Sequence, residues 1–97
     1  MVGDGRLTIV YKGRQFLYND ACEIAERIAA TTGKKMTHIR LQGVTDTTTA
    51  ALARLILLRL DLMKSGRDLQ IAGLRSRAKA LYEIDKLEGV LPRFRSP

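Results

Sequence analysis

Three consecutive hydroxyl residues follow an aspartate near the middle of the chain, in the stretch Asp46-Thr47-Thr48-Thr49. β-branched threonines are poor helix formers, yet these three stand directly before a long apolar segment. A side-chain oxygen at that place accepts hydrogen bonds from the free N–H groups that begin a helix. The same N–H groups, with the positive end of the helix dipole, would also hold a phosphate. Two interpretations are therefore open: a helix cap, and a site for a partner or a phosphate.

Few other residues have the types and spacing that chemistry needs. His38 is the single histidine and Cys22 the single cysteine, so the sequence predicts neither a metal cluster nor an internal disulfide. A structural role is the expected one for both. The sequence contains no glycine-rich phosphate loop and no set of nucleophile, histidine and carboxylate. We therefore expect no enzymatic activity, no catalytic residue, no metal and no cofactor.

The net charge is +7 for 97 residues, and basic residues become denser after Arg67. Such a charge steers a protein towards anionic partners, which include nucleic acids, membrane surfaces and acidic proteins. Only three tyrosines and two phenylalanines accompany the basic residues. Because arginines and aromatic residues do not alternate, as they do where proteins bind single strands, nucleic acid is not the expected partner.

The length and composition are typical of one small soluble domain. We expect a single domain over residues 1–97, since a chain of this size encloses one core. The sequence has 45% apolar residues but no window of about 18 uninterrupted ones, so a membrane span is not predicted. Its first residues lack the apolar segment of a secretory signal, which with one cysteine favours a cytoplasmic location.

Hydrophobic periodicity predicts three elements in the first third of the chain. Alternation predicts a strand over Arg6–Lys12, and Gln15–Tyr18 is a short second strand that we expect to pair with the first. A helix then begins at Asp20, where Asp20 and Glu23 have the spacing of a capping box. Gly33 is a typical end for that helix.

Five further elements follow. Strands are predicted over Thr37–Val44, Leu69–Leu74 and Gly89–Phe94, and helices over about Thr47–Lys64 and Ser76–Lys86. The third helix is expected to turn Ala80, Leu81 and Ile84 inward. The order β-β-α-β-α-β-α-β predicts an α/β fold, with a small mixed, mainly parallel sheet of four to five strands and helices packed on it. The second helix carries more leucines than one buried face needs, so some of them are candidates for a partner surface.

Three segments together resemble the STAS family, the sulphate transporter and anti-sigma factor antagonist domain. "HIRLQGVTDTTTAALARLILLRL" is similar to the family's strand, its Asp-Ser-Ser-Gly turn and the apolar helix after it. "SGRDLQIAGL" is similar to the family's fourth strand, and "SRAKALYEIDKLEGVLPRF" to its closing segment. The resemblance covers about Arg6 to Phe94 and implies a STAS-like fold.

In anti-sigma factor antagonists the second hydroxyl residue of that turn is phosphorylated. The resemblance therefore implies Thr48 as the phosphoacceptor, with Thr47 as the other candidate. It implies Asp46, Thr47, Thr48 and Thr49 as the surface that binds an anti-sigma factor, which is a serine/threonine kinase. Thr49 stands where the family has glycine. Arg40, Arg54 and Arg59 are candidates to flank this surface.

A second member of the same family gives a different expectation. The small cytoplasmic subunit of bacterial phospholipid-transport ABC systems is also a STAS domain, and it ends near a similar "VLPR" segment. Such a subunit binds and stabilises the transporter's ATPase. In that alternative, Thr47 or Thr48 makes a structural contact with the ATPase and is not phosphorylated. The oligomeric state is not predicted.

Overall fold

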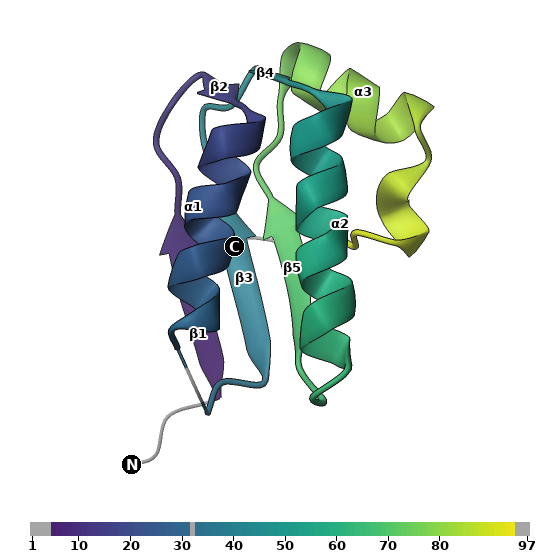
Figure 1. Cartoon of the computed structure of the whole chain (residues 1–97). Helices are drawn as coiled ribbons and strands as arrows, with labels where there is room; N and C mark the ends of the chain where they lie inside the picture. Colours follow the sequence, from purple (N-terminus) through teal and green to yellow (C-terminus); the bar gives the residue numbers. More distant parts are fainter. Residues whose placement is uncertain (1–4, 32, 95–97) are drawn as a thin grey trace.

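A three-stranded parallel sheet forms the centre of the molecule (Figure 1). The structure, a computed structural model, describes residues 5–31 and 33–94. The strands are β1 (Arg6–Val10), β3 (Met36–Arg40) and β5 (Asp68–Ala72), in the order β1-β3-β5. All pairs are parallel, as expected where helices connect successive strands of one sheet.

A second, two-stranded parallel sheet lies beyond the carboxyl ends of these strands, at the top of Figure 1. It joins β2 (Gln15–Phe16) to β4 (Asp46–Thr47). The prediction that β2 pairs with β1 was therefore wrong. The reason is that the carbonyl of Arg14 accepts the N–H groups of Thr45 and Asp46, at 2.9 and 3.1 Å, which places β2 beside β4.

Two helices cover one face of the main sheet, and a third lies at its carboxyl end (Figure 1). Helices α1 (Tyr18–Ala29) and α2 (Thr49–Met63) lie side by side over the sheet. Helix α3 (Ser76–Ile84) packs against β4, and a 3₁₀ turn, η1 (Leu87–Gly89), follows it. The predicted α/β class with mainly parallel strands is confirmed, with the five strands divided between two sheets.

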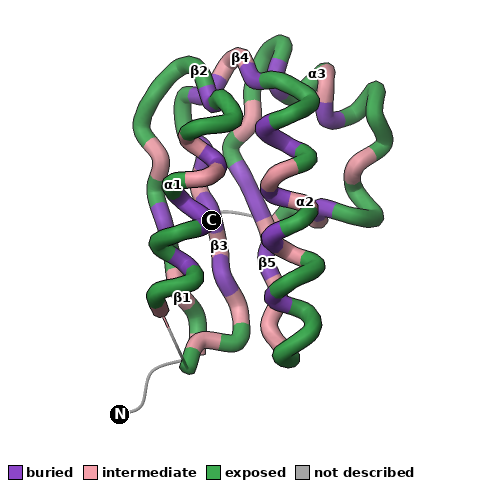
Figure 2. The backbone as a smooth tube through the Cα atoms, viewed as in Figure 1, coloured by how far each residue is buried: buried purple, intermediate pink, exposed green. Residues whose placement is uncertain are grey.

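The core lies between the main sheet and the two covering helices. Ile9, Ile39 and Ile71 share one row of the sheet and are almost fully buried. Strand residues alternate between buried and more exposed, which Figure 2 shows along β3 and β5. The helices contribute buried apolar residues at helical spacing: Ala21, Ile24, Ala25 and Ile28 from α1, and Ala51, Leu52, Leu55, Leu58 and Leu62 from α2. The periodicity that predicted these elements is thus the periodicity of burial.

Two helix starts differ from the prediction. Helix α1 begins at Tyr18, so Asp20 occupies its third position, and the Asp20 carboxylate accepts the N–H of Leu17 at 2.8 Å. The predicted capping box from Asp20 was therefore wrong. Ser76, which the sequence suggests as the cap of α3, is instead its first residue; the cap position is Arg75, and no side-chain hydrogen bond caps the helix. The N–H of Ala78 bonds to the backbone carbonyl of Thr45 at 3.0 Å.

The last predicted strand is reduced to one bridge. Within this segment only Arg93 pairs with the sheet, beside Ile71. The N–H of Ile71 donates to the carbonyl of Pro92 at 3.0 Å, and the N–H of Phe94 donates to the carbonyl of Ile71 at 2.9 Å. Pro92 lacks an N–H group, and η1 takes up the residues before Val90. The segment therefore pairs with the edge strand β5 at one residue only.

Candidate functional site

The threonine turn begins α2, and Thr48 is its cap. Thr48 has an extended backbone (φ −128°, ψ 159°), and its Oγ1 accepts the N–H of Ala51 at 3.1 Å. The helix therefore begins at Thr49, and not at Thr47 as the sequence suggested. A β-branched residue fits this place because a cap residue has non-helical dihedral angles. The cap interpretation of the turn is correct for Thr48.

Neighbouring threonines have different environments. Thr47 belongs to β4, is 8% exposed, and donates its hydroxyl to the carbonyl of Phe16 at 2.6 Å. This bond ties β4 to β2. Thr48 and Thr49 are exposed and Asp46 is half-buried. Of the two predicted phosphoacceptors, only Thr48 is an exposed residue.

A shallow groove lies beside this turn, between the start of α2 and helix α3. We call it the turn groove. One wall is the turn itself, and the other is a face of α3; the lining residues are Asp46, Thr47, Thr48, Thr49, Arg77, Ala80, Leu81 and Ile84. Ile84 is 73% exposed, the largest fraction among the exposed large apolar residues of the described chain. The groove thus combines hydroxyl groups, one carboxylate, one guanidinium and an apolar wall.

Helix α3 is fixed against the turn through backbone bonds. The N–H of Arg75 bonds to the carbonyl of Val44 at 3.0 Å, and a similar bond joins Ala78 to Thr45. Before them, Gly73 has φ +100°, and a Cβ there would lie 3.0 Å from the carbonyl carbon of Leu41. Glycine is therefore required where the chain leaves β5. These contacts hold both walls of the groove in place.

The orientation of α3 differs from the prediction. Its buried residues are Ala78 and Tyr82, and the Tyr82 hydroxyl donates to the carbonyl of Leu91 at 2.5 Å. This anchoring turns Ala80 and Ile84 outward, so the prediction that they point inward was wrong. Leu81 is half-buried.

Three arginines, Arg40, Arg54 and Arg59, were expected to flank the threonine turn. Arg59 bonds to Asp68 at 2.7 Å, and Arg40 lies 5.7 Å from the centre of the Phe94 ring. Arg54 lies farther along α2, in a separate depression. None of these three lines the turn groove; Arg77 does. The spacing of Arg77, Ala80, Leu81 and Ile84 was the sequence signal, because these positions share one helical face.

Other chemistry-bearing residues lie elsewhere and have structural surroundings. The Nε2 atom of His38 is 3.1 Å from the side-chain oxygen of Gln70, and its ring stacks on Phe94 with centroids 3.9 Å apart. Cys22 is a free, half-buried thiol on α1. Within residues 5–31 and 33–94, no three His, Cys, Asp or Glu side chains gather where they would hold a metal ion.

One carboxyl group has a clearly shifted acidity. Burial raises the pKa of Asp68, but hydrogen bonds from Arg59 and from the N–H of Leu69, with the guanidinium charge, outweigh burial and lower the pKa. This ion pair joins α2 to β5 and lies away from the turn groove. Over the same described residues, the helices are all too short or too polar to cross a bilayer.

Comparison with known proteins supports the fold. No family model matches the sequence, and no curated protein matches it. The structure is similar to the crystal structure of a sulfate transporter family protein from Wolinella succinogenes, with a TM-score of 0.75 and 15% sequence identity. The alignment covers 97% of this chain and 82% of that one. At this identity the likeness concerns architecture alone, and the chain has a STAS-like α/β fold.

Proposed function

We propose that this chain is a non-enzymatic STAS-type module that binds another protein through the turn groove and regulates it. The supporting observation is the groove's composition, with the exposed Thr48 and Thr49 facing an exposed apolar wall that ends in Ile84. Exposed apolar side chains rimmed by polar groups are typical of protein-binding sites. A cytoplasmic location and a role in regulating transcription belong to the same proposal.

In the leading version the partner is an anti-sigma factor with serine/threonine kinase activity. Phosphorylation of Thr48 would end the complex, because it adds nearly two negative charges to a surface that had fitted a neutral hydroxyl. The start of α2 suits such a group. Its first turn contains no acidic residue, its free N–H groups attract anions, and Arg77 lines the opposite wall.

Intact-mass analysis after incubation with ATP and an anti-sigma factor kinase tests this version. We expect the wild type to gain one phosphoryl group. Thr48→Ala should gain none, and Thr49→Ala, which changes the exposed neighbour, should behave as wild type. A wild type that gains no mass, or an undiminished gain in Thr48→Ala, refutes Thr48 as the acceptor.

A second version is favoured by the hydrogen bonding of Thr48. Its oxygen already accepts the N–H of Ala51, so its proton is left to donate to a partner. A permanent contact of this kind suits a subunit that binds the ATPase of a phospholipid-transport ABC system. Here Thr48 is a docking contact and no phosphorylation is needed.

Calorimetric titration of the partner, kinase or ATPase, tests the turn groove itself. Ile84→Glu places a charge on the apolar wall and should weaken binding at least tenfold, roughly 1.4 kcal/mol or more. Val90→Glu is the matched control, because Val90 is also exposed and apolar but lies outside the groove. Equal affinities for the two variants would rule out the turn groove as the docking site.

A further inference from the structure

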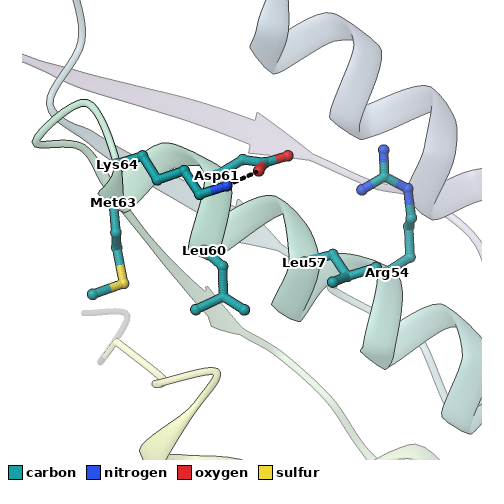
Figure 3. Close-up of a pocket in the computed structure, with 6 residues that line it drawn as sticks. All are labelled: Arg54, Leu57, Leu60, Asp61, Met63 and Lys64. Carbon is teal, nitrogen blue, oxygen red and sulfur yellow. Dashed lines mark ion pairs between the residues drawn. The ribbon is translucent and has the colours of Figure 1, made fainter.

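A second surface lies on the outer side of α2, and it shares no residue with the turn groove. Leu57 is 56% exposed, Leu60 50% and Met63 46%. Figure 3 shows these side chains projecting from one face of the helix, beside Arg54, Asp61 and Lys64. The core-facing leucines of α2 are different residues, so the fold of one copy does not account for this face.

Exposed small and apolar residues on this face recur at alternating spacings of three and four. Ala50, Ala53, Leu57 and Leu60 form this row, which we call the outer seam. Such a 3-4 pattern is the seam along which two helices pack closely, with small residues allowing a near approach. The outer seam is therefore shaped for another helix.

The charged residues beside the outer seam indicate which helix. Arg54 and Asp61 are seven residues apart, two helical turns or about 10.5 Å. Both extend to the same edge of the seam, the edge next to α1, whereas Leu60 and Met63 extend to the other (Figure 3). Leu57 lies near the midpoint between Arg54 and Asp61. Opposite charges are thus placed symmetrically about one leucine.

This arrangement is complementary to itself when two copies meet in antiparallel orientation. A two-fold axis beside Leu57 brings Arg54 of each copy opposite Asp61 of the other, which gives two ion pairs in one interface. A parallel pair would instead set the Arg54 guanidinium against the apolar edge. The charges beside the outer seam are therefore complementary in the antiparallel pair.

We infer that a second copy of this chain occupies the outer seam, in a two-fold dimer of antiparallel α2 helices. Within one copy, Asp61 lies 3.7 Å from Lys64, but both side chains are more than 70% exposed, so this pair is weak and yields to Arg54 of the other copy. Helix α2 has 15 residues and spans about 22 Å, so the outer seam offers a short contact. Because each copy also has a net charge of +7, the dimer is weak and reversible.

Sedimentation velocity of the full chain over a wide concentration range tests this dimer. Physiological ionic strength is suitable, since it screens repulsion beyond about 8 Å. We expect a monomer–dimer equilibrium for the wild type. Arg54→Asp and Asp61→Arg should each raise the dissociation constant at least about tenfold, and the double variant should restore it. Val90→Glu should leave it unchanged, and circular dichroism checks that each variant is folded.

A cross-linking experiment tests the position of the axis. In a Cys22→Ser background, Leu57→Cys should form a disulfide-linked dimer on mild oxidation, because a residue beside the axis meets its own copy. Val90→Cys in the same background should form no such dimer. A wild type that stays monomeric at every concentration, or a dimer whose affinity the two charge reversals leave unchanged, overturns the inference and assigns the seam to a different occupant.

Discussion

Replacing Thr48 separates the stability of the turn from its function. Thr48→Ala removes the oxygen that accepts the N–H of Ala51 at 3.1 Å. Because Thr48 is exposed, the variant loses a cap without leaving a cavity. The loss of an N-cap side chain costs about 1 kcal/mol. For a chain of 97 residues, this lowers the melting temperature by about 5 °C.

Two companion variants make the test specific. Thr48→Ser keeps the oxygen and should retain wild-type stability. Thr48→Asp keeps an acceptor and adds a negative charge at the helix start, where the dipole favours it, so its stability should equal or exceed that of the wild type by up to about 1 kcal/mol. Differential scanning calorimetry at low ionic strength measures all three. If Thr48→Asp is as unstable as Thr48→Ala, the start of α2 does not accept an anion, and the reasoning behind a phosphate at Thr48 is refuted.

Three further predictions concern the surrounding structure and are measured by urea denaturation. Tyr82→Phe removes the buried hydroxyl that donates to Leu91 and should cost about 1–3 kcal/mol, whereas an unchanged midpoint would show that this bond does not anchor α3. Asp68 has a folded pKa below its unfolded value, so its pairing with Arg59 stabilises the protein above about pH 4, and this stabilisation is lost as the pH falls. In Asp68→Asn the free energy of unfolding should therefore decrease less on acidification, and a pH dependence equal to that of the wild type would contradict this. Gly73→Ala should cost at least about 1 kcal/mol because φ is +100° and the added Cβ meets backbone, an expectation that an equally stable variant would overturn.

Strong periodicity made much of the fold predictable. Ile24 and Ile28 in α1, and Leu52 and Leu55 in α2, follow helical spacing and are buried as the pattern indicates. Alternation of strand and helix then implied parallel pairing in the main sheet, which the structure has. These features depend on many residues at once, so one atypical residue does not change the result.

Features that depend on one or two backbone bonds were not predictable. Strands β2 and β4 have two residues each, too few to show alternation, and the Arg14 carbonyl decides their pairing. Helix α3 is capped by the backbone of Thr45, which leaves no side-chain signal in the sequence. The outward rotation of Ile84 follows from the bond between Tyr82 and the backbone of Leu91, a contact that helical spacing within α3 does not show.

The candidate site was predictable in part for the same reason. A hydroxyl-rich turn before an apolar helix identified the Asp46–Thr49 segment, since caps have local sequence signals. The difference between the buried Thr47 and the exposed Thr48 depends on the carbonyl of Phe16, which is 31 positions away in the chain. Arg77 joins the groove only because α3 folds back onto β4.

The contrast between Thr47 and Thr48 also constrains how the proposed regulation would act. A phosphate on Thr47 would break the 2.6 Å bond to Phe16 and force a charge into a place that is 8% exposed, so it would disrupt the small sheet. A phosphate on Thr48 would replace one acceptor with several at a helix start, so the fold would persist while the charge of the turn groove changed. Regulation by phosphorylation needs the second behaviour, because a released module must remain folded to bind again. Thr48 is therefore the position at which a change of partner is compatible with an unchanged structure.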